Sequence, residues 1–175
     1  MAADALSLHR AARWLHAHRV PLLPGLLRRA GRLLFRGELP VEAQLGPGCG
    51  VGYGGLGVTV ASGVRVGRCS FLAHQVTLGP DAARRGVPTL GAYVYVGAGA
   101  QVLGPVHVGD FAVIGANAVV DTDVPRGAVV AGVPARELRR EPNPPAAFTR
   151  DTGMAVAPEF LLPEEKESAH AAARL

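Results

Sequence analysis

The chain has 175 residues, among them 23 glycines and only 5% aromatic residues, with a formal net charge of +4 from 18 basic and 14 acidic side chains. This length can bury one modest core, and the composition favours small aliphatic side chains over rings inside it. A basic excess suits nucleic acid, a membrane surface or an anionic small molecule. No aromatic residues interleave with the arginines to stack on bases, which argues against a nucleic-acid partner.

Cys49 and Cys69 are the only cysteines. They are too few for a disulfide scaffold in a chain of this size, so we expect two free thiols. No apolar run is long enough to span a membrane, and the amino end lacks the apolar stretch of a secretory signal. The histidines, cysteines and carboxylates show no metal-ligand spacing. We therefore expect a cytoplasmic protein with no membrane partner and no metal.

Residues 1–37 are the first of three predicted segments, a short helical region. Two helices are predicted, over residues 5–18 and 25–35, with Asp4 as the N-cap of the first and two prolines interrupting the chain between them. The apolar stripe of the second helix consists of Leu26, Leu27, Ala30, Leu33 and Leu34, and the arginines beside it are Arg28, Arg29, Arg32 and Arg36. We expect the stripe to pack on the following domain and the arginines to face solvent. The alternative is a helix that lies on a membrane surface.

Residues 38–140 are the second predicted segment, and they carry an aliphatic residue at every sixth position. The residues that keep this period are Val60, Val66, Leu72, Leu78, Leu90, Val96, Val102, Val108, Ile114 and Val120. A second set, four residues later in each repeat, has small or branched side chains. Neither a helix nor a hairpin sheet has this period, whereas a solenoid of short strands and corners does, with three faces and about eighteen residues per coil. The sequence therefore predicts an all-β solenoid, a parallel β-helix.

The six-residue period fails in two places. Residues 38–59 are crowded with glycine and keep it poorly, which indicates an irregular first coil that caps the stack. Residues 79–89 are polar, so a loop is expected to leave the coil there. The third predicted segment, residues 141–175, is rich in proline and charge and is expected to be a tail with at most one short helix.

Residues 72–139 contain, in this order, the segments LAHQVTLG, VGAGA, IGANAVV and GVPAR. Together with the six-residue period, they closely resemble the hexapeptide-repeat acyltransferases, and within them the serine O-acetyltransferase-like branch. The resemblance extends over residues 8–140. It implies a left-handed β-helix and a homotrimer, with active sites between neighbouring subunits. It also implies that the co-substrate acetyl-CoA lies along the outside of the coils.

Carried over residue by residue, the resemblance implies that coenzyme A contacts Ala98 of VGAGA and Ala116 of IGANAVV, and also Arg136 and Arg139 at the end of the matched region. Small side chains let the pantetheine reach backbone groups, and arginines suit phosphates through charge-assisted hydrogen bonds. A tight corner of the coil would explain the two alanines equally well.

Acyl transfer from a thioester to a hydroxyl needs a base for the hydroxyl proton and a donor for the oxyanion. Members of the serine O-acetyltransferase branch have an Asp-His pair that falls on Tyr53 and Gly54 here, and their loop histidine falls on Val87. We predict His74 as the catalytic base instead, because it stands at a corner in the repeat just before the loop. Its alternative role is a hydrogen bond at a subunit interface.

The loop offers three charged candidates for holding an acceptor. Arg84 and Arg85 suit a carboxylate, and Asp81 can orient a base, since loops on a rigid scaffold often carry function. The alternative is a loop tip that is only solvated. His107, at an outward position of a regular strand, is expected to face water.

These features together predict a trimeric, CoA-dependent O-acetyltransferase that acylates the hydroxyl of a small serine-like molecule. One alternative is acetylation of a sugar or a specialised metabolite, and another is a non-catalytic trimeric binding or scaffold protein. The replaced Asp-His pair favours the scaffold alternative. The retained VGAGA and GVPAR segments favour continued binding of CoA.

Overall fold

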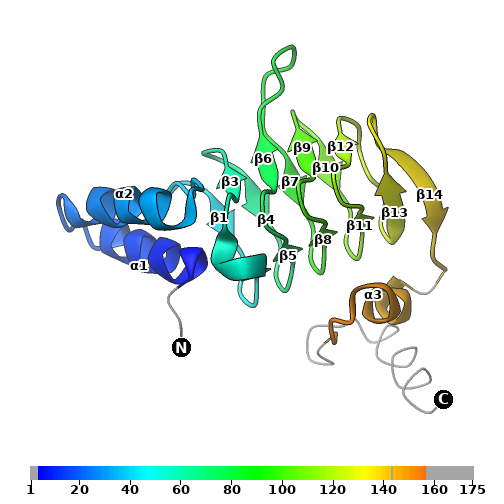
Figure 1. Cartoon of the computed structure of the whole chain (residues 1–175), viewed down its shortest axis with the longest axis horizontal. Helices are drawn as coiled ribbons and strands as arrows, with labels where there is room; N and C mark the ends of the chain where they lie inside the picture. Colours follow the sequence, from blue (N-terminus) through cyan, green and yellow to red (C-terminus); the bar gives the residue numbers. More distant parts are fainter. Residues whose placement is uncertain (1–3, 143, 157–175) are drawn as a thin grey trace.

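The computed structural model describes residues 4–142 and 144–156. A pair of helices stands at one end of a stack of short strands, and a third helix lies beneath the opposite end (Figure 1). These helices are α1 (Ala5–Ala17), α2 (Leu23–Phe35) and α3 (Pro144–Thr152). Between the two ends the chain winds as the parallel β-helix predicted from the sequence.

Three sheets form the faces of the solenoid, and their strands are parallel except for the last pair. The first sheet contains β1 (Gln44–Leu45), β4 (Arg65–Val66), β7 (Thr89–Leu90) and β10 (His107–Val108). The second contains β2 (Gly50–Val51), β5 (Phe71–Leu72), β8 (Tyr95–Val96), β11 (Val113–Ile114), β13 (Ala128–Ala131) and β14 (Arg136–Arg140). The third contains β3 (Thr59–Val60), β6 (Thr77–Gly79), β9 (Gln101–Leu103) and β12 (Val119–Val120). Neighbouring parallel strands therefore come from successive coils.

The aliphatic residues of the six-residue period form the core, as predicted. All of them are at most 4% exposed, and so are the residues of the second set. The register places Val96 beside Leu72 of the preceding coil and beside Ile114 of the following one. Burying one such side chain contributes about 1.5–3 kcal/mol, so the fold is stabilised by the stack of coils and not by any coil alone.

The segment after the last coil is more closely packed than a tail. Strand β14 pairs antiparallel with β13, and Phe148 of α3 is only 1% exposed. The Phe148 ring meets the rings of Tyr93 and Phe111 edge-on, with centroids 6.1 and 6.2 Å apart. A single buried aromatic residue in a non-periodic segment gives no pattern from which this packing could be predicted. The remainder of the predicted tail, residues 157–175, lies outside the described residues.

The helical hairpin begins as predicted. The Asp4 carboxylate accepts a hydrogen bond from the backbone N–H of Ser7 at 2.7 Å, so it caps α1. Helix α2 begins at Leu23, earlier than expected, and Pro24 lies in its first turn. A proline is tolerated there because the first backbone N–H groups of a helix have no partner within the helix. Pro24 therefore starts α2 and does not interrupt the chain before it.

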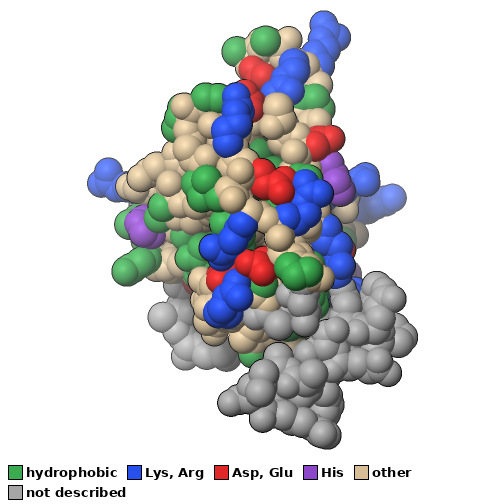
Figure 2. Space-filling model, turned by 90° about the vertical axis from the view of Figure 1, so that its right-hand side faces the viewer, with side chains coloured by type: hydrophobic (Ala, Val, Ile, Leu, Met, Phe, Trp, Pro, Cys, Tyr) green, Lys and Arg blue, Asp and Glu red, His purple; other side chains and the backbone are tan. Residues whose placement is uncertain are grey.

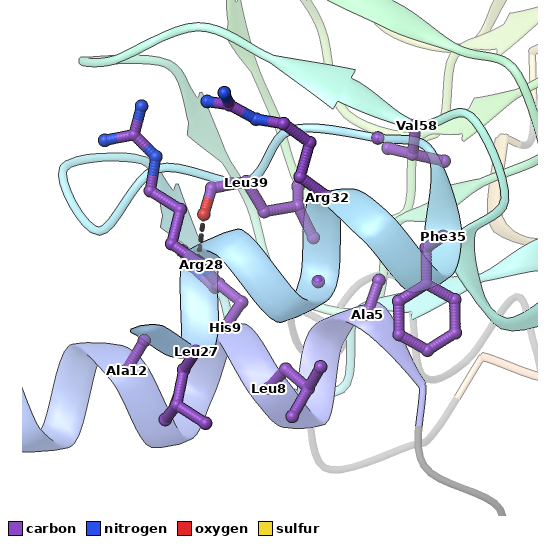
Figure 3. A pocket seen from close by; sticks show the side chains of 12 residues that line it. Ala5, Leu8, His9, Ala12, Leu27, Arg28, Arg32, Phe35, Leu39 and Val58 are labelled. Carbon is purple, nitrogen blue, oxygen red and sulfur yellow. Dashed lines mark hydrogen bonds between the residues drawn. The ribbon is translucent and has the colours of Figure 1, made fainter. Parts of the chain in front are cut away.

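The apolar stripe predicted on α2 is divided between two faces. Leu27 lines a cavity together with Leu8 and Ala12 of α1 (Figure 3), whereas Leu26, Leu33 and Leu34 are 62%, 82% and 65% exposed. The prediction that the whole stripe packs on the solenoid is therefore wrong. The reason is that α2 packs mainly on α1, and α1 packs on the first coil. Only the face of α2 that is turned toward α1 is therefore covered.

His9 attaches the hairpin to the first coil. Its side chain is 4% exposed, and its Nδ1–H donates to the Leu39 carbonyl at 3.3 Å (Figure 3). Nearby, Arg13 donates to the carbonyl of Ala43 at 2.6 Å. Burial lowers the pKa of His9, and the positive charge of Arg13 acts in the same direction. The histidine is therefore held neutral where α1 meets the coil.

Lowering the pH should weaken this attachment. A histidine whose pKa is lower in the folded protein contributes its full stability above the unfolded pKa, near 6.5, and loses it as the pH falls toward the folded pKa. Urea unfolding at about pH 7.5 and about pH 5.5, either side of that value, should show a larger drop in unfolding free energy for the parent than for His9→Asn. The asparagine keeps a donor for Leu39 but does not titrate. Equal drops in the two proteins would contradict this role of His9.

Candidate active site

The outer face of the second sheet carries a row of side chains that alternate with the buried residues. Phe71 of β5 is paired with Tyr95 of β8, and Tyr95 with Val113 of β11. Successive residues of a strand point to opposite faces, so these three face outward. The rings of Phe71 and Tyr95 stack, with centroids 5.6 Å and planes 9° apart. Gly97 and Gly115 follow along the chain, and because they have no side chains the backbone is accessible there.

The corner that follows this sheet brings His74, Ala98 and Ala116 into one column. Each of the three is followed by a residue with a positive φ, which turns the chain. The backbone N–H of Gly99 donates to the carbonyl of His74 at 3.0 Å, and that of Asn117 to the carbonyl of Ala98 at 2.8 Å. These hydrogen bonds hold the corners of successive coils in register.

A groove of about 520 Å³ follows this face and its corner. Its lining includes His74, Ala98 and Ala116 together with the rings of Tyr53, Phe71 and Tyr95. The structure thus brings together three of the residues that the sequence singled out. The other predicted site residues do not line this groove, and they are Asp81, Arg84, Arg85, Arg136 and Arg139.

Tyr53 lies against His74 at one end of the groove. Their ring centroids are 5.0 Å apart and their planes meet at 82°, an edge contact. Tyr53 belongs to the short helix η1 (Gly52–Gly55), has a φ of 49° and is 82% exposed. A methyl group on Gly52 would lie 3.3 Å from the backbone nitrogen of His74, so η1 rests directly on the His74 corner.

The aromatic lining of the groove was not predicted from the sequence. Tyr53 lies in η1, where the six-residue period fails, so its contacts have no periodic signal. Phe71 and Tyr95 could have been found. Each directly precedes a residue of the aliphatic set, and in a strand that position faces outward.

Arg136 and Arg139 lie on β14, in the same sheet as the groove but beyond its last lining strand. This end of the molecule carries interspersed basic and acidic side chains (Figure 2). Arg139 forms ion pairs with Glu141, at 2.9 Å, and with Asp151 of α3. Arg136 donates to the carbonyl of Ala135 at 2.9 Å and is exposed on the strand. Of the two arginines, Arg139 is therefore the one already committed to a carboxylate network.

The predicted loop leaves the coil between β6 and β7, and its charges pair with one another. Arg84 Nε lies 2.9 Å from the Asp81 carboxylate. A hydrogen bond from the N–H of Ala83 and the contact with Arg84 together lower the pKa of Asp81. Arg85 is exposed. None of these side chains reaches the groove of its own chain.

Within residues 4–142 and 144–156, no group of three or more histidine, cysteine or acidic residues could hold a metal ion. Both cysteines are free thiols, as expected. No helix of the described part has the length and apolar character needed to cross a membrane.

The chain is similar in sequence to known bacterial transferases. The bacterial transferase hexapeptide family (six repeats) matches residues 88–122. A serine acetyltransferase of Helicobacter pylori strain J99 is 37% identical over 139 residues, which cover 78% of this chain and 81% of that protein. The chain belongs to the serine acetyltransferase family. The corresponding enzyme of Synechococcus elongatus is 41% identical over 78% of this chain, but the chain spans only 57% of its length.

Solved structures of serine acetyltransferases share the fold. The enzyme of Brucella abortus strain S19 in complex with coenzyme A matches with a TM-score of 0.73 and 32% identity, over 78% of this chain and 55% of that one. A serine acetyltransferase in complex with cysteine matches with a TM-score of 0.74 and 30% identity, over 83% and 57%. The predicted left-handed β-helix and the predicted family are thereby confirmed.

Proposed function

We propose that this chain is a CoA-dependent O-acetyltransferase that acts on the hydroxyl of a small serine-like acceptor. The observation that carries the proposal is the groove in which His74 lies in one column with Ala98 and Ala116. The groove places an imidazole beside small side chains, which leave room for a thioester to approach it. The names of the relatives, serine acetyltransferase, support the choice of reaction.

Acetyl-CoA fits the groove as a co-substrate. The side chains of Ala98 and Ala116 end at Cβ, and Gly97 and Gly115 have none, so an extended chain can approach the backbone closely. Arg136, further along the same sheet, is the better placed of the two arginines for the phosphates, because Arg139 already pairs with Glu141. A relative in complex with coenzyme A supports this choice of co-substrate.

In the proposed reaction His74 acts as the base. Its imidazole takes the proton from the acceptor hydroxyl as the hydroxyl oxygen forms a bond to the thioester carbonyl carbon. The carbon–sulfur bond then breaks, and the imidazole returns the proton to the departing sulfur as the thiol. The edge contact with Tyr53 restricts the tilt of the imidazole ring.

We also propose that the active form is a homotrimer in the cytoplasm. The loop that carries Asp81, Arg84 and Arg85 projects from the stack of coils (Figure 1), and none of these residues lines the groove of its own chain, so in a ring of three subunits it is free to complete the groove of a neighbour. There the loop would meet the acceptor, with the Asp81 carboxylate already paired to Arg84 and so not free for an ammonium group. Two free thiols suit a reducing compartment.

Two further candidates follow from the replaced residues. By the resemblance, Tyr53, Gly54 and Val87 take the places of the Asp-His pair and the loop histidine of the branch. This favours either a different hydroxyl, such as that of a sugar or specialised metabolite, or a scaffold that binds CoA without turnover. Incubation with acetyl-CoA and a panel of serine, sugars and amino alcohols separates the three, with thiol release as the readout. Binding of CoA with no release for any acceptor would favour the scaffold.

His74→Ala should lower turnover about a hundred- to ten-thousandfold, the usual loss for a positioned base. Acetyl-CoA affinity and particle mass should not change. His107→Ala is the matched control, because that histidine is exposed on β10 of another sheet, and it should retain parental turnover. A His74→Ala protein with more than about a third of parental turnover would rule out the assignment.

The variant Arg136→Ala, Arg139→Ala should bind acetyl-CoA about ten- to a hundredfold more weakly, since Arg139 already pairs with Glu141 and the loss of one charged hydrogen bond to a phosphate costs about 1.5–3 kcal/mol. Calorimetry provides the measurement. Arg65→Ala, an exposed arginine on β4 of the first sheet, serves as the control. If the double variant binds as tightly as the parent, the phosphates lie elsewhere.

Light scattering should give a particle of about three times the chain mass of 18.1 kDa at about micromolar concentration, the range in which stable assemblies persist. The physical reason is that an isolated prism leaves flat sheet faces and one open side of the groove in water. A monomer under these conditions would contradict the trimer.

A further inference from the structure

The groove has an aromatic end beside His74. Tyr53 meets the imidazole edge-on with ring centroids 5.0 Å apart. Phe71 and Tyr95 stack on one another in the adjoining coils, and all three rings line the groove. A molecule that presents its hydroxyl to His74 therefore has aromatic surface on two sides, from Tyr53 at the end of the column and from Phe71 and Tyr95 alongside it.

This lining differs in kind from what a free amino acid requires. Serine carries an ammonium and a carboxylate, and moving either from water onto apolar surface is unfavourable unless an opposite charge or hydrogen bonds replace the lost water. Apart from His74, the side chains that line the groove are aromatic or aliphatic, or are absent at glycine. The position where the branch has an aspartate holds the phenol ring of Tyr53.

Aromatic rings favour a different acceptor. Edge or offset contacts between rings contribute about 0.5–1.5 kcal/mol beyond the burial of their area, and a flat apolar group would also bury the exposed face of Tyr53, which is 82% accessible in the single chain. The two stacked rings beside it are fixed by strand pairing in register. The surface is therefore preformed and needs no rearrangement to accept a ring.

We propose that Tyr53 determines the acceptor specificity. The preferred acceptor is a molecule that has a serine-like hydroxyl and an aromatic or apolar group, and that lacks the free ammonium and carboxylate of a zwitterion. This inference rests on the proposed acetyltransferase function and narrows its substrate class. The aromatic group lies against Tyr53 and Phe71, and the hydroxyl points toward His74.

The test compares two acceptors, L-serine and N-benzoyl-L-serinamide, which share the hydroxyl and differ in charge and ring. For the parent, kcat/KM should be at least about tenfold higher for the benzoyl compound, the discrimination expected from one well-packed apolar group. Tyr53→Ala should reduce that ratio about tenfold, mainly through KM. Tyr53→Phe should preserve it, because the ring remains. Trp14→Ala, which removes an exposed ring from α1 away from the groove, is the matched control and should change neither value.

A second variant restores the acid of the branch. Aspartate tolerates the positive φ of residue 53 better than most residues, and its carboxylate can pair with an ammonium group. Tyr53→Asp should therefore shift the preference toward L-serine, with the ratio of the two kcat/KM values falling below that of Tyr53→Ala. Calorimetry with N-benzoyl-L-alaninamide, which cannot be acetylated, measures binding separately and should show about tenfold weaker binding to Tyr53→Ala than to the parent.

The outcomes separate the two proposals. If the parent acetylates L-serine as well as the benzoyl compound, or if Tyr53→Ala leaves the ratio unchanged, the specificity assignment is wrong while the acetyltransferase function stands. If the parent acetylates no acceptor, the function is wrong. In that case binding of N-benzoyl-L-alaninamide decides the specificity proposal, and equal affinity of parent and Tyr53→Ala overturns it.

Discussion

The whole molecule depends on one constraint, which is that each short three-sided coil must close around the few side chains that point into it. The backbone groups that face along the axis bond to the coil above or below, as when Tyr95 donates to the carbonyl of Ala112 at 3.0 Å and Phe71 to that of Val94 at 2.8 Å. Side chains that point inward are therefore small or aliphatic, whereas those that point outward are not limited in size or polarity by the closure of the coil. This is why the chemistry of the chain lies on its outer surface.

The same constraint explains what could be predicted from the sequence. Residues such as Leu78 and Ile114 sit where a closed coil allows no other type, so their period predicts the fold, the buried set and the strand positions. The corner residue His74 could also be predicted, since it has a fixed place relative to the period. Elements outside the coil carry no such period. The antiparallel pairing of β14, the packing of Phe148 and the exposure of Leu33 depend on contacts that only the folded chain reveals.

In the candidate site, too, residues inside the repeat could be predicted and those outside it could not. Ala98 and Ala116 lie in one column with His74 because all three occupy equivalent places in successive coils. The contact of Tyr53 with His74 could not be predicted, because η1 adds residues that break the repeat just before the corner. Arg139 was singled out by its motif, and its ion pair with Asp151 depends on a helix that follows the repeat.

The antiparallel pair of β13 and β14 also determines what the last coil exposes to other molecules. A parallel solenoid exposes unpaired backbone groups at its final coil, and a second solenoid could in principle add to them and grow into a fibre. Here β14 reverses direction and covers β13, and its side chains, among them Arg136, Glu137 and Arg140, are exposed and charged. Charges of both signs along an outermost strand oppose pairing with another chain. The strand that closes the sheet thus also works against end-to-end polymerisation.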